Sequence, residues 1–248
     1  MNRDEIISKC RILLEAYHLG KLGYMKMPED SSPDFSDEQM ETRLVYFTLP
    51  MSLNYQRDSY KLWGSALKTF NDSETRIVFD LKSSASLDEQ RLRTYLLRYK
   101  IALQPNKHIA TWQKIAKTVY ENWGTLGNML READYDFLKL REIVQNKFKK
   151  GFPYLSGPKI FNYWCFILQQ YGKIKLKNPE FIEIAPDTHI TQCSVALGVI
   201  TKEEAELLPK EKISERWREL LLGTGINPIN MHPPLWFWSR NDFKYKID

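Results

Sequence analysis

The length, composition and charge of the chain place it among ordinary folded proteins. Its 248 residues are 43% hydrophobic and 27% charged, with only 11 Gly and 12 Pro, so it is neither collagen-like nor a disordered tail. That length suits one large domain or two lobes that share a core. The net charge of +5 indicates nucleic-acid binding only if the basic residues are concentrated in one region.

Cysteine content and hydropathy exclude further classes of protein. Cys10, Cys165 and Cys193 cannot pair completely and include no CxxC, which argues against a disulfide framework, a zinc knuckle and a four-cysteine iron–sulfur cluster. No apolar run approaches the roughly 20 residues that a membrane span needs. We therefore expect a soluble cytoplasmic protein with no membrane partner.

Helical spacing begins near the N-terminus. Residues 3–19 place apolar side chains three and four residues apart, and Gly20 follows where a helix would end. The next segment is acidic and rich in proline and serine, which is typical of a solvated loop. Within it, Ser36 can cap the following helix, with Gln39 at capping-box spacing.

From residue 37 almost to the end, apolar residues recur every three or four positions, which excludes a strand period for most of the chain. Only residues 173–177 alternate, and that run is short enough to be a loop. We predict an all-α protein of about ten or more helices. After the segments 44–51, 60–70 and 92–97, the predicted helices cover residues 108–123, 135–148, 159–171, 188–197, 202–208, 213–222 and 227–238.

The basic residues are concentrated between Lys139 and Pro179. This segment contains nine basic residues and a single acidic one, Glu142, so the rest of the chain is slightly acidic. The concentration indicates one phosphate-binding face, although a solvated lysine-rich surface has the same composition. The nine basic residues are Lys139, Arg141, Lys147, Lys149, Lys150, Lys159, Lys173, Lys175 and Lys177.

A turn in the middle of this segment opens directly into a helix. Residues 151–160 contain glycine and proline, and Pro158 takes the first helical turn, where its missing N–H costs nothing. Free amides at a helix N-terminus attract anions. The expected anion site comprises the amides of Ser156, Gly157 and Lys159 with the side chains of Lys149 and Lys150.

Three motifs resemble a known family. Residues 153–159, Pro-Tyr-Leu-Ser-Gly-Pro-Lys, resemble the hairpin turn of the helix-hairpin-helix (HhH-GPD) DNA glycosylases related to endonuclease III, whose motif ends in the nucleophilic lysine. Residues 185–190, Ala-Pro-Asp-Thr-His-Ile, resemble that family's segment with the catalytic aspartate. Residues 224–236 are similar to the terminal segment of the archaeal 8-oxoguanine DNA glycosylase branch. The resemblance covers roughly residues 40–240.

The resemblance implies a fold, a function and a partner. It implies an all-α, two-lobed domain with a cleft between its lobes, one formed by about residues 50–148 and the other by residues 1–49 and 149–248. It implies a bifunctional DNA glycosylase and AP lyase of base excision repair that removes an oxidised purine such as 8-oxoguanine. The expected partner is double-stranded DNA with a damaged base, bound by a monomer without an iron–sulfur cluster, redox cofactor or catalytic metal.

Two residues carry the chemistry in this reading. Lys159 would attack the sugar C1′, and the resulting Schiff base would permit strand cleavage by β-elimination. Partial burial beside Phe161, Tyr163 and Trp164 would favour the neutral amine that this attack needs. Asp187, at a helix start after Pro186, would remain ionised, relay the lysine's proton and stabilise positive charge at C1′.

An extruded base is held by stacking and edge hydrogen bonds, so the pocket needs aromatic and polar side chains. Trp236 with His232 is the first candidate pair, and Tyr60 with Trp63 is the second. We expect Trp112, Trp123, Trp164 and Trp217 to pack in the core. The remaining predicted DNA contacts are Leu155 in the turn, His189 at a phosphate, and Gln56 or Arg57 in the gap left by the base.

Two alternatives remain open. A DNA-binding module without activity would keep the hairpin, with Lys159 as a phosphate contact and Asp187 as a plain helix N-cap. A glycosylase for a different base is the other alternative, since the archaeal branch has an aspartate where this chain has His232.

Overall fold

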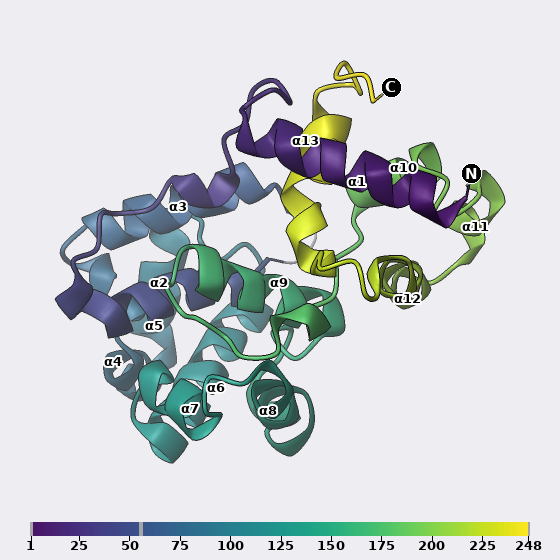
Figure 1. Ribbon diagram of the computed structural model, residues 1–248. Helices are drawn as coiled ribbons and strands as arrows, with labels where there is room; N and C mark the ends of the chain where they lie inside the picture. The colour runs from purple at the N-terminus through teal and green to yellow at the C-terminus, as the bar shows by residue number, and fades with distance from the viewer. Residues whose placement is uncertain (1, 55–56, 248) are drawn as a thin grey trace. The chain divides into compact units, whose positions relative to one another are not determined.

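The computed structural model describes residues 2–54 and 57–247, and these residues form helices and connecting turns without a named strand (Figure 1). The prediction of an all-α protein is thereby confirmed. The alternating run at residues 173–177 contributes only an isolated bridge between Asp136 and Lys177. In the part of the chain that is described, no helix combines the length and the apolar character needed to cross a membrane.

The chain divides into two compact units. Unit 1 comprises Met1–Lys26 and Asn178–Asp248, and unit 2 comprises Met27–Lys177. These boundaries differ from the predicted lobes, because the segments 27–49 and 149–177 group with the middle of the chain.

Unit 1 is built around the pairing of its first and last helices. Helix α1 (Arg3–His18) lies beside α13 (His232–Arg240), which also packs on α10 (Thr188–Ala196) (Figure 1). Its core includes the fully buried Leu13 and Leu235. The remaining helices of the unit are η6 (Pro179–Phe181), α11 (Lys202–Leu207), α12 (Lys210–Leu221) and η7 (Pro228–Met231).

Unit 2 is organised around α2 (Met40–Ser52), which is buried from Arg43 onward. A helix that is apolar on all sides must be covered on all sides, and α2 packs against neighbours that include α3, α7 and α9. The helices of the unit besides α2 are η1 (Pro28–Asp30), η2 (Asp37–Gln39), α3 (Ser59–Asn71), η3 (Thr75–Phe79), α4 (Leu81–Ser86), α5 (Glu89–Arg98), α6 (Pro105–Trp123), α7 (Leu126–Glu132), α8 (Phe137–Arg141), the π-helix η4 (Glu142–Lys147), η5 (Lys149–Gly151) and α9 (Pro158–Gln170).

The predicted helix starts agree with the structure where local chemistry defines them. The predicted capping box is present, with the Ser36 amide donating to Gln39 Oε1 at 3.0 Å. Pro158 occupies the first turn of α9, and Asp187 is the N-cap of α10. Both positions depend on side chains within a few residues of the helix start, so the sequence alone is sufficient to locate them.

Candidate active site and nucleic-acid interface

A helix, a turn and a second helix follow one another in the basic segment of unit 2. The first helix begins as α8 and continues as the π-helix η4, and the second is α9. Gln145, on the π-helix, donates a hydrogen bond of 3.0 Å from Nε2 to the Ser156 carbonyl and so ties the first helix to the turn. A side chain at Gly151 would collide with Thr118, because an added Cβ would lie 2.5 Å from its nearest atom.

Amides of the turn donate hydrogen bonds within the turn itself, and the predicted anion site is corrected accordingly. The Ser156 amide donates to the Phe152 carbonyl at 2.9 Å, and the Gly157 amide donates to the Tyr154 carbonyl at 2.9 Å. These two groups are therefore not free to bind an anion. Leu155 is also corrected as a DNA contact, because its side chain is fully buried in the apolar core.

The cationic side chains around the turn remain available. Lys149, Lys150 and Lys159 are exposed and form no ion pair with any described residue. Other bases of the segment are partly neutralised, since Asp134 pairs with both Lys139 and Lys177. Uncompensated positive charge therefore remains around the turn.

Lys159 differs in one respect from its prediction. Partial burial was expected to favour its neutral amine, but the side chain is exposed at the first turn of α9. The apolar face of this helix is formed instead by residues such as Phe161, Trp164 and Cys165, which are fully buried. Lys159 shares its face of the helix with Tyr163, one turn further along.

A buried carboxyl group contacts this face of α9. Glu29, in η1, is 1% exposed, and Tyr163 donates its phenol proton to Glu29 Oε1 at 3.2 Å. The indole of Trp63 is near enough to lower the pKa of this carboxyl slightly. Among the described residues, however, neither Trp63 Nε1 nor Glu29 Oε2 has a hydrogen-bond partner. Leaving buried polar atoms unsatisfied costs about 1–3 kcal/mol each, so this pair is an unfavourable feature of the core.

Burial sets the ionisation of Glu29. Desolvation raises the pKa of this carboxyl to about 7, and the hydrogen bonds from its own backbone amide and from Tyr163 offset only part of the effect. A protonated carboxyl both donates and accepts a hydrogen bond, whereas a carboxylate only accepts. Near neutral pH, the group can therefore supply either pattern to a bound molecule.

We expect Glu29→Gln to stabilise the protein at alkaline pH. An unfolded Glu loses its proton near pH 4.5 and the buried one near pH 7. Raising the pH through this window therefore lowers the wild-type free energy of unfolding, by about 3 kcal/mol at most. The variant lacks this titration, so its advantage should grow from pH 5 to pH 8. Urea unfolding at both pH values measures it, and a constant difference would contradict burial as the cause.

Tyr60 and Trp63, the second pair predicted for the base pocket, lie in different environments. The Trp63 side chain is fully buried, with its ring centroid 5.7 Å from that of Phe47 and 6.0 Å from that of Tyr46. A ring packed in this way has no free face for a base, and its Nε1 is buried as well, so Trp63 is corrected as a base-pocket residue. Tyr60 is half-buried on the same helix, α3.

Asp187 lies in unit 1, at the N-terminus of α10. Its Oδ1 accepts a hydrogen bond of 2.9 Å from the Ile190 amide at the start of α10. Its Oδ2 accepts no hydrogen bond from the described residues. The side chain is half-buried. One carboxylate oxygen thus caps the helix, and the other is available to a ligand.

The first predicted base-pocket pair lies on α13. Trp236 is half-buried, with the His189 ring edge-on at 5.6 Å between centroids and the Arg240 guanidinium 4.9 Å from its centroid. His189 Nδ1 lies 3.0 Å from Ser239 Oγ, which positions the imidazole. His232, one turn before Trp236, is only 5% exposed.

Two further predicted DNA contacts, Gln56 and Arg57, were expected to fill the space left by the everted base. Gln56 lies outside the described residues. Arg57 donates from Nη1 to the Ile101 carbonyl at 2.6 Å and from Nη2 to the Lys100 carbonyl at 3.0 Å. Its guanidinium therefore holds the segment after α5 in place.

No model of a known protein family matches the chain, and a search of curated proteins found no significant match. Among the described residues, no group of three or more His, Cys, Asp or Glu side chains could hold a metal ion.

Sequence reasoning missed Glu29. This residue is one of several acids in a segment that was interpreted as a solvated loop, and nothing in its spacing marks it as buried. Its burial results from contacts with α3 and α9, which are distant in sequence. Three of the four tryptophans predicted to pack in the core, Trp112, Trp164 and Trp217, are fully buried, and Trp123 is partly exposed.

Proposed function

We propose that this protein is a DNA glycosylase with AP lyase activity, acting on DNA that carries a damaged base, with an oxidised purine as its substrate. The proposal depends mainly on the position of Lys159. It is an exposed amine that forms no ion pair with any described residue, at the N-terminus of the second helix of a helix-turn-helix segment. It also lies one helical turn before Tyr163, which hydrogen-bonds the buried Glu29.

In the proposed reaction, Lys159 Nζ attacks the C1′ of the everted nucleotide as the bond from C1′ to the base breaks. The departing base takes up a proton. Asp187 contributes a carboxylate oxygen that stabilises positive charge at C1′ and accepts a proton from the lysine. Loss of a second proton from the nitrogen and opening of the sugar give a Schiff base, which permits β-elimination of the 3′ phosphate.

Recognition of the base would use an aromatic ring for stacking and polar groups for hydrogen bonds to its edge. Trp236, supported by His189 and Arg240, offers a ring in unit 1 for stacking.

The test is base release from a panel of lesion duplexes. We expect single-turnover excision from at least one duplex with an oxidised purine, such as 8-oxoguanine, and no excision from the undamaged duplex. Excision of some other base would support a glycosylase of different specificity, the alternative suggested by His232. Release of no base from any lesion would contradict the enzyme assignment.

A DNA-binding module without activity is the second candidate. It is favoured by the position of Asp187 Oδ1 as an ordinary helix cap and by the exposure of Lys159, both of which suit structural and phosphate-binding roles. Such a module would leave lesion DNA chemically intact and would tolerate Asp187→Asn without any functional loss.

DNA affinity should fall steeply as salt concentration rises, because each neutralised phosphate releases counterions. We expect Lys149→Gln to weaken binding of all duplexes similarly and to reduce the slope of log affinity against log salt by about 1. Fluorescence anisotropy over a range of salt concentrations measures both quantities. An unchanged slope would show that the hairpin does not contact the DNA backbone.

A further inference from the structure

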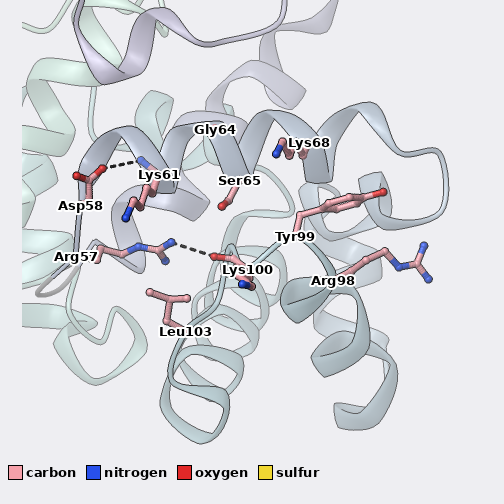
Figure 2. Close-up of a pocket in the computed structure, with 10 residues that line it drawn as sticks. All are labelled: Arg57, Asp58, Lys61, Gly64, Ser65, Lys68, Arg98, Tyr99, Lys100 and Leu103. Carbon is pink, nitrogen blue, oxygen red and sulfur yellow. Dashed lines mark hydrogen bonds between the residues drawn. The ribbon is translucent and has the colours of Figure 1, made fainter.

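Unit 2 contains a cavity of about 520 Å³ whose lining includes none of the residues of the proposed chemistry. One wall is a single face of α3 with the residues just before it, and the other wall is the segment 98–103, which follows from the end of α5 (Figure 2). A volume of this size accommodates a small organic ligand. The lining residues are Arg57, Asp58, Lys61, Gly64, Ser65, Lys68, Arg98, Tyr99, Lys100 and Leu103.

The charge of this lining is strongly positive. Five of its residues are cationic and only Asp58 is acidic. Arg98 is already neutralised by ion pairs with Asp72 and Glu74. Three cations remain exposed and without an ion pair among the described residues, and these are Lys61, Lys68 and Lys100. Three uncompensated lysines around one cavity indicate a site for an anion such as phosphate.

Gly64 keeps the helical wall of the cavity open. It lies in the interior of α3, where glycine is less favourable than alanine because it loses more backbone freedom on folding. An added Cβ would meet no atom within 4 Å, so packing within the protein does not require glycine here. Glycine at such a position allows a ligand to approach the helix backbone closely.

The opposite wall is held rigidly. Arg57 binds the carbonyls of Lys100 and Ile101, and Tyr99 donates its phenol proton to Asp72 Oδ2 at 2.9 Å. These contacts fix the backbone that carries Lys100 and place the Tyr99 ring and Leu103 in the lining. A preorganised site loses less entropy when its ligand binds.

We propose that this cavity binds a nucleotide unit, with its phosphate held by the lysines and its sugar or base against Tyr99 and Leu103. The ligand class is a nucleotide phosphate, supplied either by a nucleic-acid strand or by a free nucleotide. The site goes beyond the proposed glycosylase activity, since neither Lys159 nor Asp187 lines it.

The experiment measures binding of an undamaged single-stranded oligonucleotide to the full-length protein. We expect Gly64→Leu, which fills the cavity without changing the charge, to lower the affinity about tenfold or more. The double variant Lys61→Glu with Lys68→Glu should do the same, because it reverses two phosphate-binding charges. Gly64→Ala should bind like the wild type, since a single methyl group leaves most of the cavity open.

The matched control is the double variant Lys114→Glu with Lys117→Glu, which makes the same charge change at exposed positions of α6. It should weaken binding less than threefold, and Gly64→Leu should unfold at no lower a temperature than the wild type. Equal losses in both double variants would overturn the proposal, because they would show non-specific attraction. Wild-type affinity in Gly64→Leu would also overturn it.

A second titration distinguishes the source of the phosphate. Deoxyadenosine monophosphate that binds the wild type but not Gly64→Leu would identify a free nucleotide as the ligand, whereas an effect on the oligonucleotide alone would identify a nucleic-acid strand. The excision assay is scored separately. If no lesion is excised but Gly64→Leu still loses oligonucleotide binding, the proposed function fails and the nucleotide site stands.

Discussion

Lys159→Gln is expected to lower the single-turnover rate of strand cleavage at a lesion by about 10³-fold or more, because no other group in the proposed reaction forms the Schiff base. Glutamine keeps most of the length and polarity of the side chain but removes the amine. The side chain is exposed at the first turn of α9, so the fold should be unaffected. Thermal unfolding within a few degrees of the wild type would verify this point.

The matched control for this variant is Lys150→Gln, which removes a second exposed lysine near the hairpin. It should weaken DNA binding modestly through a lost phosphate contact and leave the rate constant at saturating protein unchanged. If Lys159→Gln behaved like this control, Lys159 would be a phosphate contact and the DNA-binding module would be the better account.

Asp187→Asn is expected to lower the excision rate by about 10²- to 10⁴-fold, a typical loss for a group that transfers a proton and stabilises charge in the transition state. Asparagine is as good an N-cap as aspartate, so α10 should keep its start and the protein its stability. DNA affinity should change little, since the substitution removes a negative charge instead of a cationic phosphate contact. Single-turnover kinetics and anisotropy separate the two quantities.

The control here is Asp88→Asn, which makes the same change at another N-cap. Asp88 Oδ1 accepts from the Arg91 amide at 2.9 Å at the start of α5, as Asp187 Oδ1 accepts from Ile190. This variant should excise at the wild-type rate. A small, equal effect of both substitutions would show that Asp187 serves only as a cap.

Local features of the site were predictable from the sequence. Pro158 at the start of α9 and Asp187 at the start of α10 follow from helix-end chemistry that acts over three or four residues. Other features were not, because they depend on the turn's own hydrogen bonds or on distant contacts. The amides of Ser156 and Gly157 were expected to be free but are bonded inside the turn.

The burial of Glu29 likewise could not be predicted from the local sequence. An acidic residue beside proline and serine is typical of a solvated loop, yet α3 and α9 bury it and raise its pKa to about 7. Trp63 was expected to present a ring to the base, but Phe47 and Tyr46 already pack against that ring. Spacing along one helix identifies an apolar face and does not reveal which residues cover it.

The central claim, that Lys159 is the nucleophile, is tested most directly by borohydride reduction of the protein mixed with lesion DNA. Reduction converts the Schiff base into a stable amine bond, so a covalent complex of protein and DNA should accumulate, and peptide mapping should locate the DNA on Lys159. The complex should be absent in Lys159→Gln and present in Lys150→Gln. A complex attached at another residue, or one that persists in Lys159→Gln, would contradict the account.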